Sequence, residues 1–297
     1  MRKIILKAPA KINLGLSILK KLPSHYHEVK TIYTQVSLFD ELKIEEIDGN
    51  KIEIDCNDQN IPTDKNNLAY QVVELVKNQT KIKKGLKIFI EKNIPVGSGL
   101  GGGSSDAAQT LIGLNKLWDL GLSLERLTGL ARKIGMDVAY QLQGGVKLEI
   151  QGGKETGQFT KLKALPKETL IVLCFPNLFI TSPWAYQRVE YGKINKNSLA
   201  NLIKAINNQD FLEINQNLHN DFELWTLKKF PLIRKIKEQM LRYGALGSLM
   251  SGKGSTVFGI FNNLEKAKLA KQVLKKDFKK TFLVKPLCHS ELDSESI

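Results

Sequence analysis

A glycine-rich loop that runs directly into an apolar helix pattern restricts the fold of this chain more than any other feature. Five of the seven residues from 97 to 103 are glycine, and the pattern that follows predicts a helix over residues 105–118. Without side chains, glycines let backbone N–H groups approach a bound anion closely. The first turn of a helix adds N–H groups without acceptors and the positive end of the helix dipole. The segment therefore predicts a phosphate-binding loop.

Three other interpretations of this loop compete with that prediction. The spacing Gly97-x-Gly99-x-x-Gly102 matches the dinucleotide fingerprint, but that motif needs an N-terminal βαβ unit and an acidic residue after the next strand. A Walker A loop ends in Gly-Lys-Ser/Thr, whereas this loop ends in Gly-Ser-Ser. The structural alternative is a flexible loop in which Ser105 or Asp106 only caps a helix. A glycine run between a strand and an apolar helix is rarely idle, so phosphate binding is preferred.

The charge of the chain is strongly basic. It carries 44 Lys and Arg against 30 Asp and Glu, a formal net charge of +14. Such a balance suits nucleic acid, a membrane surface or a phosphorylated substrate, or it is simply a Lys-rich solvated surface, which is the simplest explanation. Only six of the 44 basic residues are Arg, the side chain that makes most bidentate contacts to bases. The composition therefore argues against a dedicated nucleic-acid reader.

The cysteines and the hydropathy pattern predict a cytoplasmic protein. The three cysteines, Cys56, Cys174 and Cys288, are far apart and form no CxxC pair, so neither a disulfide framework nor a zinc site is expected. No stretch approaches the roughly 18 uncharged apolar residues that a membrane helix requires. Lys7 and Lys11 interrupt the apolar start, which excludes a signal peptide.

Strand and helix patterns are distributed as in an α+β protein with two halves. Alternating, β-rich runs dominate the first 56 residues, and helical patterns are interspersed with short strands further on. A polar segment rich in Gly and Lys at 151–167 marks the expected boundary between the halves. The predicted domains are residues 1–155 and 156–286, followed by a polar tail at 287–297.

Three segments in order along the chain resemble the motifs of the GHMP kinases. Residues 8–14 (Ala-Pro-Ala-Lys-Ile-Asn-Leu) resemble the N-terminal motif, and residues 95–108 resemble the second, glycine-rich motif. Residues 250–259 resemble the C-terminal glycine loop. The resemblance covers about residues 5 to 285 and implies an ATP-binding, ribosomal-S5-like N-terminal domain, a ferredoxin-like C-terminal domain and a substrate cleft between them.

The resemblance also implies ATP and Mg²⁺ as the cofactors of a phosphoryl-transfer reaction. The residues expected to hold the nucleotide are Pro95, Val96, Gly97, Ser98, Gly99, Leu100, Gly101, Gly102, Gly103, Ser104 and Ser105. The resemblance makes Asp137 the catalytic base and Lys11 its charged neighbour. Taken alone, Lys11 could be a solvated charge, and Asp137 could be the N-cap of a short helix.

Within the family, the pair Tyr26-His27 and the segment 135–138 resemble the branch that phosphorylates the 2-hydroxyl of a cytidine-diphosphate-linked sugar alcohol. That resemblance implies that Tyr26 stacks on cytosine and that His27 hydrogen-bonds its edge. The remaining substrate-binding candidates are Asn13, Tyr186, Gly252 and Gly254. Lys253 stands where the resemblance favours a small residue.

Two other functions stay open at this point. One is a related kinase that acts on homoserine or a mevalonate, which would not need Tyr26 and His27 as a cytosine clamp. The other is a non-catalytic nucleic-acid-binding protein that uses the basic charge. The preferred expectation is a monomeric or homodimeric enzyme whose partner is a small cytidine-diphosphate substrate, with neither nucleic acid nor membrane as a partner.

Overall fold

The computed structural model describes residues 2–23, 27–152, 157–191, 194 and 199–287. The strands are β1 (Lys3–Lys21), β2 (His27–Ile47), β3 (Ile52–Cys56), β4 (Gly85–Glu91), β5 (Lys147–Gln151), β6 (Gln158–Lys161), β7 (Leu170–Cys174), β8 (His219–Asn220), β9 (Gly247–Met250), β10 (Val257–Phe261) and β11 (Thr281–Val284). The helices are α1 (Leu68–Thr80), α2 (Gly102–Leu117), α3 (Leu124–Ile134), α4 (Met136–Gln143), α5 (Ser182–Tyr186), α6 (Ala200–Asn208), α7 (Phe211–Gln216), α8 (Glu223–Lys229), α9 (Pro231–Arg242) and α10 (Leu264–Asp277).

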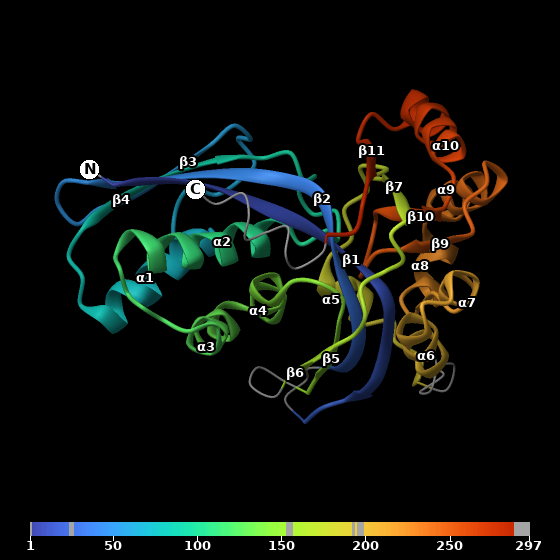
Figure 1. The fold of residues 1–297 in the computed structure, drawn as a ribbon, viewed down its shortest axis with the longest axis horizontal. Coiled ribbons are helices and arrows are strands. Elements are labelled where there is room, and N and C mark those ends of the chain that lie inside the picture. The colour runs from blue at the N-terminus through green and yellow to red at the C-terminus, as the bar shows by residue number, and fades with distance from the viewer. Residues whose placement is uncertain (1, 24–26, 153–156, 192–193, 195–198, 288–297) are drawn as a thin grey trace.

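Two long antiparallel strands, β1 and β2, form the backbone of the larger sheet (Figure 1). The path of this sheet runs β3-β4-β2-β1-β8, and β5 and β6 extend it from β2. The pairing of β1 with β2 shifts register between Pro9 and Ala10, between Asn13 and Gly15, and between Ile18 and Lys20. Such irregularities bend a strand and re-aim its side chains. β1 therefore continues through the first motif as one bent strand.

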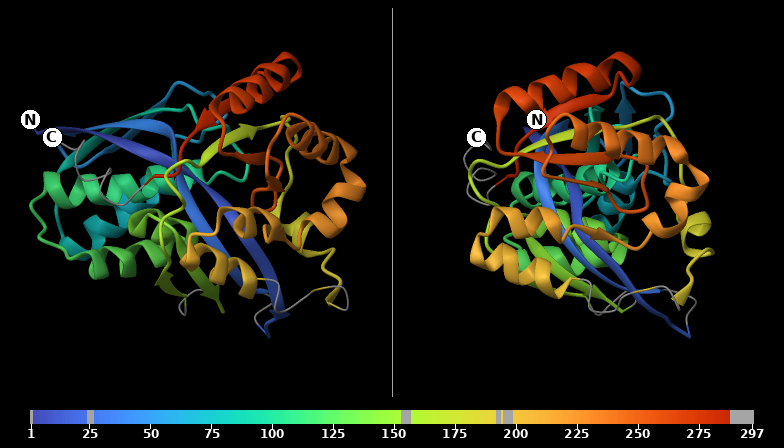
Figure 2. Two further views of the ribbon diagram at one scale, coloured as in Figure 1. Left: turned by 45° about the vertical axis from the view of Figure 1, so that its right-hand side comes forward. Right: turned by 90° about the vertical axis from the view of Figure 1, so that its right-hand side faces the viewer.

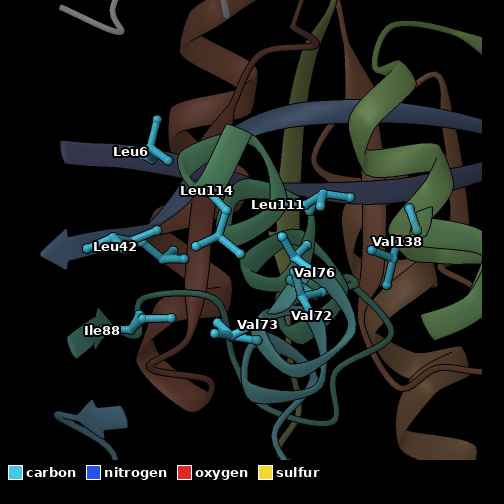
Figure 3. Packing of buried hydrophobic residues seen from close by; sticks show 14 of the residues in the cluster. Leu6, Leu42, Val72, Val73, Val76, Ile88, Leu111, Leu114 and Val138 are labelled. Carbon is cyan, nitrogen blue, oxygen red and sulfur yellow. The ribbon is translucent and has the colours of Figure 1, made fainter. Parts of the chain in front are cut away.

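Helices α1 to α4 cover one face of this sheet and enclose the first core (Figures 1 and 3). Val72, Val73 and Val76 of α1 lie on one helical face, because Val76 follows Val73 by three residues and Val72 by four. They pack with Leu111 and Leu114 of α2 against the apolar side of the strands. This packing fixes the position of α2, and therefore of the glycine loop that precedes it.

The second sheet, β11-β7-β10-β9, is antiparallel and packs with the C-terminal helices (Figure 2). A shared hydrophobic cluster joins it to the first sheet: Ala10 and Ile12 of β1 lie in the same core as Leu173 of β7 and Leu249 of β9. Strand β8 also pairs with β1, opposite Gly15 and Leu16. The two halves of the chain are therefore packed together along β1, and the predicted boundary at 155 stays a prediction.

Helix α2 begins earlier than the sequence predicts. The expected start was near residue 105, whereas the helix begins at Gly102 after Gly101, whose φ of 71° lies in the left-handed region. No side chain caps it. The N–H of Ser105 is bonded to the carbonyl of Gly101, so the N–H groups of the preceding first turn have no partner within the helix. Glycine lowers the cost of the left-handed turn that exposes these groups.

Among the described residues, none of the helices combines the length and the apolar character needed to span a bilayer.

Candidate active site

The three segments singled out from the sequence meet at one place. The N–H of Lys11 donates to the carbonyl of Leu100 at 2.9 Å, which joins β1 to the glycine loop. The hydroxyl of Ser251 donates to the carbonyl of Gly99 at 3.3 Å and accepts the N–H of Asn13 at 3.4 Å. Asn13 and Ser251, which are 238 positions apart in the chain, thus share one hydrogen-bonded junction. Beside it lies a cavity of about 430 Å³ that all three segments line.

Most of the predicted nucleotide-binding residues line this cavity, namely Pro95, Val96, Gly97, Ser98, Gly99, Gly101, Gly102, Gly103 and Ser104. Two do not. Leu100 is buried in the core that joins the two halves, where it anchors the loop. Ser105 is fully buried, and its hydroxyl has no hydrogen-bond partner among the described residues. Gly102, Gly103 and Ser104, whose N–H groups have no acceptor within the helix, line the same cavity as the other loop residues, which suits anion binding.

Two glycines of the loop, Gly99 and Gly101, make close contacts with the other two segments. A Cβ on Gly99, whose φ is +85°, would lie 2.7 Å from the carbonyl oxygen of Ser251 and 2.9 Å from that of Gly254. A Cβ on Gly101 would lie 3.1 Å from Cγ of Lys11. The 3.1 Å contact at Gly101 would be tight, whereas the contacts of 2.7 and 2.9 Å at Gly99 would require the backbone to shift. Gly99 therefore lets the loop lie against the C-terminal glycine loop.

Lys11 and Asp137, the predicted catalytic pair, are neighbours. Nζ of Lys11 lies 3.7 Å from Oδ2 of Asp137 and donates a 2.7 Å hydrogen bond to Oδ1 of Asn13. The Lys11 side chain is 6% exposed, whereas that of Asp137 is 39% exposed and borders the cavity. Asp137 lies in the first turn of α4, and the N-cap of that helix is Gly135 without a side-chain cap. Asp137 is therefore free of the capping role that the sequence left open.

Tyr33 is a site residue that the sequence interpretation missed. Its hydroxyl donates to Oδ1 of Asp137 at 3.1 Å, and its ring stacks on Tyr140 at 4.3 Å. Burial, with the nearby charge of Asp137, raises the pKa of Tyr33 well above its ordinary value, so the hydroxyl remains a donor. Thr31 and Tyr33 alternate on β2 and both line the cavity. The period of two along a strand beside the first motif was the signal that could have identified them.

Lys92 is the second missed residue. Its ammonium group forms ion pairs with Asp40 and, at 2.7 Å, with Asp106, and its side chain is only 4% exposed. Burial alone would lower the pKa of Lys92, but the attraction of the two carboxylates raises it above its ordinary value. Lys92 borders the cavity, and Nζ lies 3.1 Å from where a Cβ on Gly102 would be. A fixed cation thus stands directly behind the phosphate cradle.

A second cavity of about 630 Å³ adjoins the first, because Gln151 and Ser182 line both. His27 and Tyr186 line the second cavity and stack on each other with centroids 4.6 Å apart. Burial, followed by repulsion from Lys21, lowers the pKa of His27, so the ring is neutral near pH 7 and offers one donor and one acceptor. Tyr26 lies outside the residues that the structure describes.

The C-terminal glycine loop closes the other side of the first cavity. Gly252 and Lys253 line it, whereas Gly254 contributes the carbonyl that packs against Gly99. A Cβ on Gly252 would lie 3.2 Å from Oδ1 of Asn13. Burial, with repulsion from Lys11, lowers the pKa of Lys253. Lys253 thus lines the same cavity as Lys11 and Lys92, and its proton is held less tightly than on an ordinary lysine.

A buried carboxylate, Glu149, lies behind the catalytic pair. It is 0% exposed, and its Oε2 accepts a 2.7 Å hydrogen bond from Nε2 of Gln151. Burial, with the charge of Asp137, raises the pKa of Glu149 from 4.5 to about 7, against the opposing effects of Gln151, Tyr33 and Arg132. A carboxylate with this pKa changes charge in the neutral pH range.

This pKa gives a prediction about stability. The raised value means that folded protein holds the proton of Glu149 more tightly than unfolded chain does, so stability falls as pH rises from about 4.5 to 7. The cost above this window is at most about 3 kcal/mol. Glu149→Gln is therefore expected to raise the Tm at pH 8 and to leave it nearly unchanged at pH 4.5. Thermal unfolding at both pH values checks this, with the exposed Glu53→Gln as control. Equal shifts at both pH values would contradict the assignment.

Taken together, the arrangement suits transfer of a phosphoryl group to a hydroxyl. It combines an amide cradle for phosphate, cations held in place at Lys11 and Lys92, a further lysine, Lys253, and an accessible carboxylate, Asp137, that can accept a proton. Phosphoryl transfer requires positioning, charge neutralisation and a proton acceptor. No nucleophilic side chain in the cavity is needed for it.

Comparison with known proteins identifies relatives of both halves. The profile of the GHMP kinases N terminal domain matches residues 67–145, and that of the GHMP kinases C terminal domain matches residues 202–280. A 4-diphosphocytidyl-2-C-methyl-D-erythritol kinase of Listeria innocua is 40% identical over 98% of this chain and 99% of its own. The enzyme of that name from Clostridioides difficile is 40% identical over 95% of this chain and 94% of its own.

Solved structures agree with the fold. A crystal structure of 4-(cytidine 5'-diphospho)-2C-methyl-D-erythritol kinase superposes with a TM-score of 0.79 at 30% identity and covers 95% of this chain and 98% of that one. A homoserine kinase from Cytophaga hutchinsonii also gives 0.79, at 19% identity, over 96% of this chain and 95% of its own. The second likeness concerns the fold alone. The predicted α+β architecture with N- and C-terminal kinase domains is confirmed.

Proposed function

The chain belongs to the GHMP kinase family, and on this premise we propose that it transfers the γ-phosphoryl group of ATP to the 2-hydroxyl of 4-(cytidine 5'-diphospho)-2-C-methyl-D-erythritol, a step in non-mevalonate isoprenoid precursor biosynthesis. One observation of the site carries the proposal. The cavity that holds the Lys11–Asp137 pair adjoins a second cavity, which the stacked rings of His27 and Tyr186 line. A phosphoacceptor that ends in a nucleobase fits this pair of cavities.

The residues of the first cavity account for the chemistry. The first-turn amides of α2 and the glycine loop hold the triphosphate, and Lys92 adds charge from behind. Asp137 accepts the proton of the attacking hydroxyl, and the Tyr33 hydroxyl fixes one of its oxygens. Lys11 neutralises charge between Asp137 and the transferring group, and Asn13 holds the ammonium of Lys11 in place.

Mg²⁺ belongs to this proposal as a companion of the triphosphate. Among the described residues no group of three or more His, Cys, Asp and Glu could hold a metal ion by itself. Mg²⁺ is commonly bound by one or two protein oxygens together with substrate phosphates. Ser104 lines the cavity, and Oδ1 of the nearby Asp106 has no hydrogen-bond partner among the described residues, so the side-chain oxygens of these two residues fit that role. Bound there, the ion would neutralise charge on the phosphate oxygens.

The second cavity supports recognition of the cytosine. The neutral ring of His27 can donate and accept hydrogen bonds at the base edge, and the aromatic surface of Tyr186 can stack on the base or on His27 itself. We assign Tyr26 to the same base by resemblance, and Gly252 and Gly254 to the substrate phosphates. Gly252 lies close to Asn13, since a Cβ on it would be 3.2 Å from Oδ1 of Asn13, and we assign Asn13, which lines the first cavity, to the sugar alcohol.

A coupled assay of ADP release tests the substrate. With Mg·ATP, the cytidine substrate is expected to support turnover, and homoserine and mevalonate are not. Turnover with homoserine or mevalonate alone would instead favour the related kinases. Salt-sensitive binding of nucleic acid without ATP binding would favour the non-catalytic alternative.

Tyr186→Leu gives a sharper test of the base site. It is expected to raise KM for the cytidine substrate about tenfold or more, because stacking on a base contributes roughly 1–3 kcal/mol. The KM for ATP should stay nearly unchanged. Tyr243→Leu, in the same half of the chain but away from both cavities, is the matched control. An unchanged KM for the cytidine substrate in Tyr186→Leu would remove this residue from the site.

The cellular setting follows from the proposed substrates. ATP and cytidine-diphosphate derivatives are cytoplasmic metabolites, so we place the reaction in the cytoplasm. The partner is the small-molecule substrate, and the expected oligomeric state, monomer or homodimer, remains a prediction for size measurements in solution.

A further inference from the structure

A hydrogen-bonded chain connects the catalytic carboxylate to the buried one. The Tyr33 hydroxyl donates to Oδ1 of Asp137 at 3.1 Å. Nε2 of Gln151 donates to the Tyr33 oxygen at 2.8 Å and to Oε2 of Glu149 at 2.7 Å. Three elements supply these groups, α4, β2 and β5, and β5 is paired with β2. This series of hydrogen bonds therefore has a carboxylate at each end, Asp137 and Glu149.

We propose that Glu149 is a positioning residue for the catalytic base: its ionised carboxylate holds Gln151 so that the Tyr33 hydroxyl hydrogen is directed to Asp137. This inference rests on the proposed function, in which Asp137 accepts the substrate proton. It assigns work to Tyr33, Gln151 and Glu149, which none of the sequence motifs includes.

The number of donor hydrogens on Gln151 and Tyr33 determines which group donates to which in this series of hydrogen bonds. The Gln151 amide has two N–H hydrogens, and both are used, one on the Tyr33 oxygen and one on Glu149. The Tyr33 hydroxyl has a single hydrogen, for which Asp137 and Glu149 compete. Because Nε2 of Gln151 occupies both the Tyr33 oxygen and Oε2 of Glu149, the hydrogen is directed to Oδ1 of Asp137 at 3.1 Å. An ionised Glu149 only accepts, so it favours the amide orientation in which nitrogen faces it.

Protonation of Glu149 removes this preference. A protonated carboxyl is itself a donor, and the Gln151 amide can then turn its oxygen toward it. In that orientation the amide oxygen also faces Tyr33, whose hydrogen is drawn away from Asp137. Asp137 then loses the bond that fixes its Oδ1. The charge on Glu149 thus selects which end of the chain receives the tyrosine hydrogen.

The surroundings of Glu149 place its charge change near neutrality. The titratable groups that shift its pKa are Arg132 of α3, Asp137 of α4 and Tyr33 of β2. Phe159 of β6 is its cross-strand neighbour. Oε1 has no hydrogen-bond partner among the described residues. The pKa of Glu149 is about 7. The ionised carboxylate of Glu149 lowers the stability of the fold above pH 7, and residues that lower stability in this way are often retained because they serve the function.

The pH profile of kcat tests the proposal. In the unaltered enzyme, kcat is expected to fall about threefold to tenfold as pH drops from 8 to 6. Glu149→Gln cannot titrate but keeps an acceptor oxygen, so its kcat should stay level across this range. Glu149→Met removes the acceptor and should lower kcat at all pH values without a change in the KM for ATP. If kcat of Glu149→Gln fell between pH 8 and pH 6 as much as kcat of the unaltered enzyme, the proposal would be overturned.

Tyr33→Phe separates this role from a merely structural one. It removes the link but keeps the ring that stacks on Tyr140. In the Tyr33→Phe background, Glu149→Gln should have no further effect on kcat or on its pH profile. Additive effects of the two substitutions would show that Glu149 does not act through Tyr33 and would overturn the proposal.

A titration without substrate distinguishes failure of this inference from failure of the proposed function. ¹³C NMR of labelled glutamate carboxyls follows Glu149 directly, and Asp137→Asn is expected to move its midpoint to lower pH. The exposed Asp48→Asn is the control and should leave the midpoint in place. If the midpoint of the Glu149 titration were unchanged in Asp137→Asn, the coupling between Glu149 and Asp137 would be rejected, even if the enzyme phosphorylates the cytidine substrate. Coupling without turnover of that substrate would reject the proposed function alone.

Discussion

Asp137→Asn is expected to lower kcat by about two or more orders of magnitude, because an amide cannot accept the proton of the attacking hydroxyl. The substitution keeps the shape of the side chain, and it keeps an oxygen that can accept the Tyr33 hydroxyl. The ATP cradle lies on α2 and the glycine loop, so the affinity for ATP should change little. Steady-state kinetics with the cytidine substrate, together with calorimetric ATP binding, measures both.

The control for this variant is Asp48→Asn, an exposed carboxylate beyond the end of β2. It removes the same charge from the same half of the chain and should leave kcat within about twofold, as surface substitutions usually do. Near-normal turnover of Asp137→Asn would move the base to another residue. Loss of ATP binding in Asp137→Asn would mean that the carboxylate organises the cradle rather than the proton transfer.

Gly99→Ala is expected to abolish ATP binding and to lower the free energy of unfolding by about 3 kcal/mol or more, the range of severe substitutions. An L residue at a φ of +85° is strained, and the added Cβ would lie 2.7 Å from the Ser251 carbonyl oxygen. That backbone cannot move freely, because the Ser251 N–H is bonded to the Thr256 carbonyl at 2.9 Å. Relief therefore requires the glycine loop to leave the junction.

Chemical denaturation and ATP titration check this second prediction. Gly129→Ala is the matched control, since Gly129 is exposed within α3 and a Cβ there meets nothing within 4 Å. Alanine favours a helix over glycine by roughly 0.5–1 kcal/mol, so this control should be neutral or slightly stabilising. A Gly99→Ala protein as stable as the parent would show that the contact with the C-terminal loop does not determine the shape of the nucleotide loop.

Local signals in the sequence were enough to predict the glycine loop and the helix behind it, because their residues act within a few positions of one another. The Lys11–Asp137 pair was predicted only from the resemblance to the family, since each residue alone has an ordinary structural explanation. The start of α2 was predicted three residues late, because glycine has low helix propensity and the sequence gives no weight to packing. Tertiary contacts of the loop override that propensity.

The rest of the site depends on pairings between distant segments. Tyr33 reaches Asp137 only because β2 is paired with β1 in one particular register, and a shift of one residue would turn its side chain to the other face. Glu149 reads as one polar residue in a short strand, and its burial follows from how β5 and β6 extend the sheet. The alternation along β2 can mark Tyr33 as a residue of the buried face, but no local pattern indicates that Asp137 and Glu149 are its neighbours.

The packing of β1 against both sheets has a consequence for how such an enzyme can be altered. Ala10 and Ile12 fill a core to which the second sheet also contributes, and Ser251 ties the last motif to the first two. A chimera that joined this N-terminal half to the C-terminal half of a relative would have to match side-chain volumes along that seam. Exchange of substrate preference by swapping halves is therefore constrained by interior fit rather than by the chemistry of the pocket.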